Sequence, residues 1–169
     1  MPIPEPLAAA FAALGIAAPC VEHPPLRTVA DAHAHWDHLP GMAAKNLFIK
    51  DAGKQYWLVT LPAERSVDTK ILASVIGAKR ISFGSADDLR AILGVEPGSV
   101  TPLAALNDTG RQVRVVLHAA MAEAAAVLVH PLVNTATLIM KPADLLRFMA
   151  AHGGAALVDL TPAFRPEGG

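Results

Sequence analysis

The sequence predicts a single α/β domain in which short helices surround a mixed, mostly antiparallel sheet. A chain of 169 residues with 53% hydrophobic side chains can bury one sizeable core, and no change of composition indicates a second domain. Segments with helical spacing alternate with short apolar runs of strand character. Two of these runs are joined by a four-residue turn, DAGK, which is typical of an antiparallel hairpin. We expect one domain over residues 1–169, with a core over about 4–160 and a frayed tail at 163–169.

In the first half of the chain, capping residues predict the helices. The segment MPIPEPLAAAFAALG predicts a short amphipathic helix that ends at Gly15. Thr28, followed three residues later by Asp31, resembles a capping box and predicts a helix from about Val29 to His38. The strands expected here are APCVEH, KNLFIK and QYWLVTLP, with the DAGK turn between the last two.

In the second half, Asp68 and Ser85 are expected to cap the helices DTKILASVIG and SADDLRAILG. Pro142 starts a last helix, which Gly153 ends. The segment GSVTPLAAL is expected to be an irregular loop. The strands expected are KRISF, VRVVLH, AAAVLVHP, NTATLIM and AALVDL.

Composition and charge exclude several classes of protein. The formal net charge is −1, so any contact with nucleic acid must come from a local patch of Lys and Arg. Cys20 is the only cysteine, which excludes an internal disulfide and a multi-cysteine metal site and is typical of a cytosolic protein. The N-terminal apolar run lacks the basic start of a signal peptide, and no uncharged run resembles a membrane span of roughly 18 residues.

The common catalytic motifs are missing from the sequence. There is no GxSxG elbow, HExxH, P-loop or GxGxxG motif. His33, His35 and His38 lie on one predicted helix, but their spacing does not align them on one face, so we expect solvated histidines and no metal site. Cys20 is expected to be a small core residue without a catalytic base.

Lys45 lies at the start of a strand that looks buried. Strand alternation in KNLFIKD places Lys45 on the same face as Leu47 and Ile49, and Asn46 on the other face. A lysine at a strand end that extends to water is the simpler interpretation.

Two further segments could contribute to a site. In GVEPGSVTP, Pro97 and Gly98 predict a turn, and Pro102 holds Thr101 extended, so a stiff loop would present backbone N–H groups in a fixed direction. Such groups could stabilise an oxyanion or position water, although a plain rigid connection has the same composition. In HPLVNTATL, His130 closes one apolar strand, and a lone histidine there is more often structural than functional.

Together, KNLFIKD, the following WLV strand, LGVEPGSVTPLAALND and HPLVNTATL closely resemble the YbaK and prolyl-tRNA synthetase editing-domain family. The resemblance extends from about Pro4 to Leu160. It implies a barrel-like sheet and an aminoacyl-tRNA deacylase, most similar to the free-standing enzymes that hydrolyse Ala-tRNA(Pro). It also implies a cytoplasmic enzyme without a cofactor, in which the ribose hydroxyl of the substrate assists the attacking water.

The resemblance also implies roles for individual residues. Lys45 holds the aminoacylated 3′ end, Gly98 lines the site with backbone groups, and His130 helps to place the terminal adenosine. His118 stands where the family commonly carries an aspartate, so no acid role is assigned to it. The expected substrate-binding residues are Asn46, Ser99, Val100, Thr101, Pro102 and Asn134.

The implied partner is the acceptor end of a mischarged tRNA(Pro), and prolyl-tRNA synthetase is a further candidate partner. The cations nearest the motif are Lys50, Lys79 and Arg80, which could contact the acceptor stem or be solvated surface charges. Cys-tRNA(Pro) and Ser-tRNA remain alternative substrates, since a small group in a pocket changes binding by only about 1–3 kcal/mol. A catalytically silent module that binds a tRNA end or a protein is the alternative to an enzyme.

Overall fold

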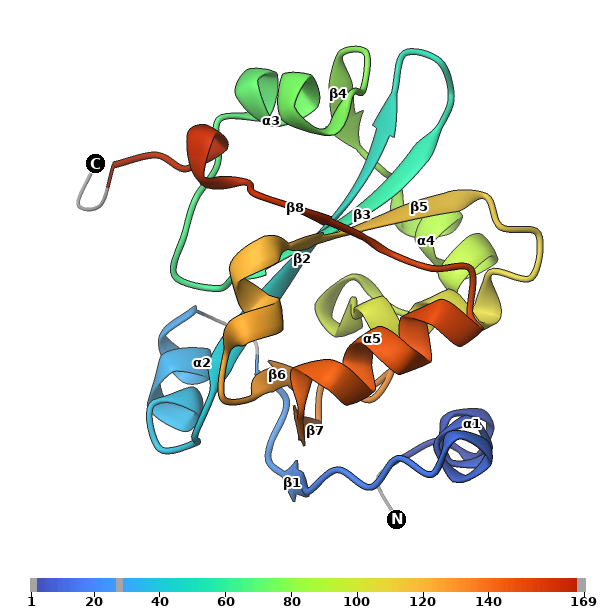
Figure 1. Cartoon of the computed structure of the whole chain (residues 1–169), viewed down its shortest axis with the longest axis vertical. Helices are drawn as coiled ribbons and strands as arrows, with labels where there is room; N and C mark the ends of the chain where they lie inside the picture. The colour runs from blue at the N-terminus through green and yellow to red at the C-terminus, as the bar shows by residue number, and fades with distance from the viewer. Residues whose placement is uncertain (1–2, 27–28, 167–169) are drawn as a thin grey trace.

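The computed structural model describes residues 3–26 and 29–166, without the side chains of Val29 and His33 (Figure 1). The capping role expected for Thr28, and the last three residues of the expected frayed tail, lie outside the described residues. Within the described part, the chain folds as an α/β structure with a mixed eight-stranded sheet. The predicted fold class is therefore confirmed.

The strands follow the order β1-β7-β6-β2-β3-β5-β8, and β4 also pairs with β2. The pairs β1–β7, β6–β7, β2–β3 and β2–β4 are antiparallel, whereas β2–β6, β3–β5 and β5–β8 are parallel. The strand bounds are β1 Cys20–Glu22, β2 Met42–Asp51, β3 Tyr56–Pro62, β4 Ile81–Phe83, β5 Val113–His118, β6 Val127–Val129, β7 Ala136–Met140 and β8 Ala156–Val158.

Most helices begin and end where the capping residues in the sequence indicate. The Asp68 carboxylate accepts hydrogen bonds from two N–H groups of the first turn of α3, and the Ser85 hydroxyl accepts one from Asp88 N–H at the start of α4. Gly15 ends α1 with a φ of 66°, a left-handed conformation that glycine adopts without strain. The helix bounds are α1 Glu5–Leu14, α2 Val29–Trp36, α3 Thr69–Ile76, α4 Ala86–Leu93 and α5 Pro142–Ala151.

The segment expected to be an irregular loop contains two short 3-10 helices, Pro97–Ser99 and Pro102–Asn107. Proline occupies the first position of each, where its missing N–H costs nothing. The second 3-10 helix is largely buried against the core, so this stretch is a packed part of the fold.

The two faces of β2 and β3 contribute to different core clusters. Phe48 and Leu58 belong to a cluster that α1, α4 and α5 help to form, with Phe11 of α1 meeting Phe148 of α5 edge to face. Ile49 and Val59 belong to a second cluster under α3. The predicted alternation along KNLFIKD is therefore confirmed, and Lys45 lies on the strand face of Leu47 and Ile49.

Candidate functional site

Among the described residues, no strand pairs with part of one edge of β2. On this edge, β6 pairs with β2 only at Met42 and Ala43, and β4 pairs only from Ile49 to Asp51. Residues 44–48, which we call the open edge of β2, lie between these two partners. Lys45 and Asn46 are both within it.

The backbone of Asn46 faces the open edge. Met42 N–H donates toward β6, to Ala126 O, and Phe48 O accepts from Gly84 N–H on the β4 side. Since alternate residues of a strand direct their backbone groups to the same edge, Asn46 N–H and C=O also point there. The open edge thus offers a backbone donor and acceptor.

The side chain of Asn46 connects β2 to the predicted loop. Asn46 Nδ2 donates to Val100 O at 2.9 Å, and Asn46 Oδ1 accepts from Thr60 Oγ1 at 2.6 Å. Thr60 is fully buried and lies opposite Asn46 in the β2–β3 register. The Asn46–Thr60 pair therefore fixes the position of Val100 beside β2.

Hydrogen bonds within the loop determine which of its N–H groups can meet a ligand. Ser99 N–H donates to Glu96 O, and Leu103 N–H donates to Thr101 Oγ1. Because Pro97 and Pro102 have no N–H, the remaining candidates are those of Gly98, Val100 and Thr101. Ser99, Thr101 and Pro102 are buried within the loop.

Gly98 connects the loop to the turn that follows β6. Gly98 is exposed, and a Cβ added there would lie 3.4 Å from Asn134 Nδ2, at the limit of ordinary contact. Gly98 therefore lies close to Asn134, so the predicted residues Asn46, Gly98, Val100 and Asn134 form one connected group.

His130 follows directly after β6, next to the open edge. The parallel register pairs Met42 with Val127 and Ala43 with Leu128. The chain therefore leaves β6 at His130 close to the point where the open edge of β2 begins. Of the residues predicted to be catalytic, Lys45 lies within the open edge, and Gly98 belongs to the loop that Asn46 binds through Val100 O.

The ring of His130 presents a free acceptor. His130 Nδ1 lies 3.3 Å from Ala136 O, and since a carbonyl only accepts, Nδ1 carries the proton and Nε2 holds a lone pair in the neutral ring. Burial lowers the pKa of His130, the hydrogen bond to Ala136 O opposes this, and nearby His23 lowers the pKa further. His130 is thus held toward its neutral form.

Lys45 is half-buried, and burial lowers the pKa of its ammonium group because the charged form loses hydration. Lys45 and Asn46 project from opposite faces of β2, but both border the open edge. A ligand lying along this edge could therefore meet the ammonium from one side and the Asn46-bound loop from the other.

The predicted tRNA-binding cations lie at the far end of β2. Lys50 is half-buried with its Nζ over the Tyr56 ring, 5.4 Å from the centroid, and Lys79 and Arg80 are exposed. A hollow of about 480 Å³, which we call the basic hollow, is lined by Lys50 and Arg80. Lys54, which was not among the predicted residues, also lines it. The complete set of lining residues is Lys50, Asp51, Ala52, Lys54, Arg80, Ile81 and Ser82.

His118 and Cys20, to which no catalytic role was assigned, lie within the packed fold. His118 is buried, its Nδ1 accepts from Leu160 N–H at 3.1 Å, and its ring meets Phe164 edge to face. Cys20 is half-buried, and burial followed by nearby Glu22 raises the pKa of its thiol, which disfavours the reactive thiolate. Neither residue is placed to react with a ligand at the open edge.

The expectation of solvated helix histidines is wrong for His35. Its Nε2 is buried and has no hydrogen-bond partner among the described residues, and its ring packs on His23 with centroids 4.2 Å apart. His23 in turn contacts Thr137 Oγ1 through Nε2 at 2.9 Å. The contact with His23, which directly follows β1, partly buries His35, whereas His38 is exposed as expected. Among the described residues, no group of histidine, cysteine and carboxylate side chains is arranged to hold a metal ion.

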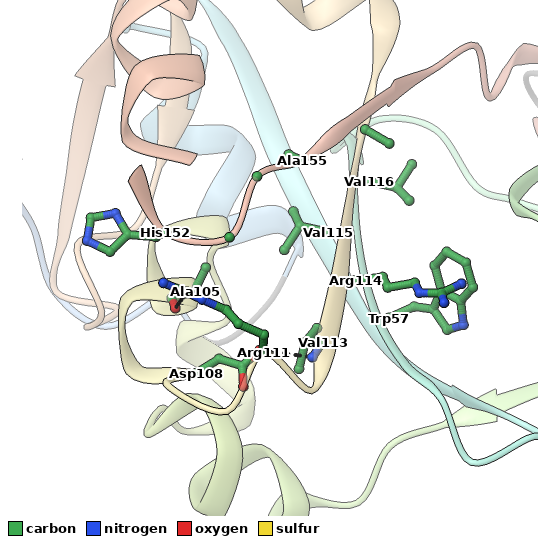
Figure 2. Close-up of a pocket in the computed structure, with 13 residues that line it drawn as sticks. Trp57, Ala105, Asp108, Arg111, Val113, Arg114, Val115, Val116, His152 and Ala155 are labelled. Carbon is green, nitrogen blue, oxygen red and sulfur yellow. Dashed lines mark hydrogen bonds between the residues drawn. The ribbon is translucent and has the colours of Figure 1, made fainter. Parts of the chain in front are cut away.

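A separate hollow of about 500 Å³ lies where β5 runs beside the chain that leads into β8 (Figure 2). Arg114 stacks over Trp57 with its guanidinium 5.3 Å from the ring centroid, and Arg111 lies against Gly153. None of the predicted site residues lines this hollow. Among the described residues, no helix is both long and apolar enough to cross a membrane.

Two functional candidates were missed by the sequence analysis. Thr60 could have been found by counting residue pairs outward from the DAGK turn, since a hairpin register places it opposite Asn46. Lys54 lies in the turn itself, and its proximity to Arg80 depends on the pairing of β4 with β2, for which the sequence carries no local signal.

Comparison with known proteins shows the family to which the chain belongs. The model of the "Aminoacyl-tRNA editing domain" family matches residues 23–148. The chain is 38% identical over 148 residues to "Prolyl-tRNA synthetase associated domain-containing protein 1" of Bos taurus, covering 85% of this chain and 86% of that protein. It is 34% identical over 134 residues to "Prolyl-tRNA editing protein ProX" of Acetoanaerobium sticklandii, covering 79% of this chain and 82% of that protein.

A solved structure, described as a proposed trans-editing enzyme for prolyl tRNA synthetase, is similar with a TM-score of 0.69. At 17% identity, covering 90% of this chain and 94% of that one, it supports the fold alone. The matched family model spans the open edge, the 3-10 loop and His130. This chain therefore belongs to the aminoacyl-tRNA editing domain family.

Proposed function

We propose that the protein is a trans-editing hydrolase that removes alanine from mischarged Ala-tRNA(Pro). The observation that carries this proposal is that the open edge of β2 carries Lys45 and is joined by Asn46 to the loop around Gly98. The family and the relative named as a prolyl-tRNA editing protein support editing as the general activity. The choice of alanine and the roles of single residues are the further content of the proposal.

The reaction is hydrolysis of an ester. The oxygen of water bonds to the carbonyl carbon of the aminoacyl group, and the carbon–oxygen bond to the ribose then breaks. The ribose oxygen gains a proton, and the products are free alanine and uncharged tRNA. Negative charge develops on the carbonyl oxygen in the transition state, so fixed donors near that oxygen accelerate the reaction.

The open edge supplies such donors without a side-chain nucleophile. In the proposed complex, the N–H groups of Gly98 and Val100 meet the developing oxyanion, and the Lys45 ammonium adds a positive charge. The hydrogen bond from Asn46 Nδ2 to Val100 O holds the loop in place before the substrate arrives. This preorganisation is what makes backbone donors effective.

His130 places the ribose. With Nδ1 bound to Ala136 O, the neutral ring offers Nε2 as an acceptor for a ribose hydroxyl of the terminal adenosine. That contact fixes the one hydroxyl that the ester leaves free on this ribose, and the same hydroxyl assists the attacking water. Asn134, in contact with Gly98, lines the same end of the site.

The basic hollow contacts the phosphates of the acceptor stem. Lys50 lies five residues from Lys45, which corresponds to about 17 Å along an extended strand. At about 3.4 Å per stacked nucleotide, this distance spans about five nucleotides. Cations at the hollow would therefore meet the tRNA several nucleotides from the ester.

Several relatives carry "Prolyl-tRNA synthetase associated domain" in their names. We propose that this protein also associates with prolyl-tRNA synthetase, the enzyme that produces the mischarged substrate. Such an association would shorten the time between mischarging and hydrolysis.

The experiment that tests the function measures single-turnover loss of the ester from Ala-tRNA(Pro), with wild type and with the Lys45→Ala variant. We expect wild type to deacylate the tRNA. The deacylation rate of Lys45→Ala should be lower by two or more orders of magnitude, because removal of one electrostatic contact to the transition state typically slows a reaction about 10²–10³-fold. Lys141→Ala, an exposed lysine at the start of α5, is the matched control. Binding of tRNA without any ester hydrolysis would instead identify a silent binding module.

A further inference from the structure

A further hollow, beside α3, adjoins the basic hollow. It has a volume of about 600 Å³, and Arg80 and Ile81 line both hollows. Figure 1 shows α3 next to β4, the strand that starts at Ile81. We call this hollow the α3 groove. Its other lining residues are Thr69, Lys70, Ala73, Ser74 and Ala78.

The described residues that line the α3 groove include two cations and no acid. Lys70 and Arg80 are both exposed, and neither forms an ion pair with another described residue. Arg90 and Arg147, by contrast, are paired with nearby carboxylates. The Asp68 carboxylate, next to the groove, accepts hydrogen bonds from two N–H groups of α3 as its cap. The positive charge of the groove is therefore available to an anionic partner.

The backbone at Arg80 is held in an unfavourable conformation. Its φ is 38°, in the left-handed region that residues other than glycine rarely adopt. Ala52 N–H, in the turn between β2 and β3, lies 2.7 Å from Lys79 O and 3.0 Å from Arg80 O. Strain of this kind persists only where the surrounding structure imposes it, and it is frequent at ligand sites. The clamped turn keeps Arg80 at the boundary of the two hollows.

The two cations stand toward opposite ends of the α3 groove. Lys70 is in the first turn of α3, whereas Arg80 follows the end of the helix. Lys70 lies six residues before Ile76, the last residue of α3, which is about 9 Å along the helix. The residues that line the groove between the two cations along the chain, Ala73, Ser74 and Ala78, are small. A ligand backbone can therefore approach α3 closely between two positive charges.

We infer that the α3 groove binds phosphates of the tRNA acceptor stem, with Lys70 as a phosphate contact in addition to those of the basic hollow. RNA carries one negative charge per nucleotide, so a single stem can meet cations at both ends of the groove and in the adjoining hollow at once. Arg80, which borders both surfaces, makes them one continuous basic surface. The inference rests on the proposed function for its choice of RNA.

The test measures binding of uncharged tRNA(Pro) over a range of salt concentrations, so hydrolysis does not enter. Loss of one phosphate contact lowers the slope of log affinity against log salt by about 0.7–0.9. We expect this loss in Lys70→Ala, whereas Lys70→Arg, which keeps the charge, should retain the wild-type slope. A double variant with Lys50→Ala should lose about 1.4–1.8, because the two lysines would meet different phosphates.

A single-stranded RNA with only the unpaired 3′ nucleotides of the tRNA is the second probe. Lys70→Ala should bind this RNA as wild type does, because the RNA lacks the stem that the α3 groove contacts. Lys141→Ala, at an exposed position before α5, is the matched control and should follow wild type with both RNAs.

An unchanged affinity and salt slope of Lys70→Ala on tRNA(Pro) would overturn the inference, and so would an equal loss on the single-stranded RNA. Normal tRNA binding by Lys70→Ala together with lost binding of prolyl-tRNA synthetase would also overturn it, since an acidic protein surface would then occupy the groove. Deacylation of Ala-tRNA(Pro) by wild type is measured separately. A failure of the proposed function appears in that assay, whereas a failure of this inference appears only in the Lys70 variants.

Discussion

Asn46 is the residue on which the candidate site depends most. Its side chain joins β3 to the 3-10 loop through Thr60 Oγ1 and Val100 O, and its backbone faces the open edge. The sequence analysis named Asn46 as a substrate-binding residue, but the structure shows that its amide is already occupied within the protein. We therefore expect its side chain to act by positioning the loop.

Replacement of Thr60 with valine tests this positioning role. Thr60 is fully buried, so Thr60→Val keeps the shape of the side chain but leaves Asn46 Oδ1 without its donor, at a cost of about 1–3 kcal/mol in free energy of unfolding. We also expect slower deacylation, because the loop is less firmly held. Thr60→Ser, which keeps the hydroxyl group, is the control for chemical denaturation and for activity. Similar loss of activity in both variants would show that the hydroxyl group does not matter.

Two partly buried histidines, His35 and His130, predict how stability depends on pH. Burial, together with nearby His23 and His38, lowers the pKa of His35, and burial and His23 lower that of His130. Below about pH 6.5 the unfolded chain therefore takes up protons that the folded protein resists, so the free energy of unfolding should fall as the pH drops from 7.5 to 5.5. The lowered pKa values of Asp51 and Asp159 act below about pH 4, outside this window.

Urea unfolding of wild type, His35→Gln and His38→Gln at both pH values measures this effect. The glutamine at position 35 removes one titrating group at the contact with His23, so His35→Gln should lose less stability between pH 7.5 and 5.5 than wild type. His38→Gln, at an exposed position, should follow wild type closely. A wild-type stability that rises toward pH 5.5 would contradict the assignment of neutral, partly buried histidines.

At the scale of elements, β2 organises the candidate functional surface. The open edge lies toward its start, and the basic hollow lies at its other end. Strand alternation was enough to predict the faces of Lys45 and Phe48. The open edge was not predictable, because it arises from where β6 and β4 stop pairing, and these contacts join segments far apart in the sequence.

Lys50→Ala and Arg80→Ala test the hollow. We expect each variant to deacylate Ala-tRNA(Pro) more slowly at subsaturating concentration and to act normally on an alanyl-adenosine fragment, because the fragment has no acceptor stem. Each lost phosphate contact should lower the slope of log affinity against log salt by about 0.7–0.9. Lys141→Ala serves again as the control. Equal losses on tRNA and fragment would place these residues in the pocket for the aminoacyl group.

At the scale of the whole molecule, the sequence alone was sufficient for the fold class and most element positions. Caps such as Asp68 and Ser85 gave local signals, and the DAGK turn gave the hairpin. The 3-10 helices around Gly98 were missed because such short turns have no periodic pattern, and the partial burial of His35 was missed because it depends on packing against His23. The net charge of −1 also conceals the gathering of Lys50, Lys54 and Arg80 in one hollow.

The most direct test of the account is a comparison of four esters of the same tRNA. Purified protein is offered tRNA(Pro) charged with alanine, cysteine, serine or proline, and the loss of each ester is followed under single-turnover conditions. We predict that the alanyl ester is cleaved fastest and that the prolyl ester is spared, because a site that selects alanine, as we propose, would be too small for a pyrrolidine ring. Faster cleavage of the cysteinyl or seryl ester, or rapid loss of the prolyl ester, would contradict the proposed function.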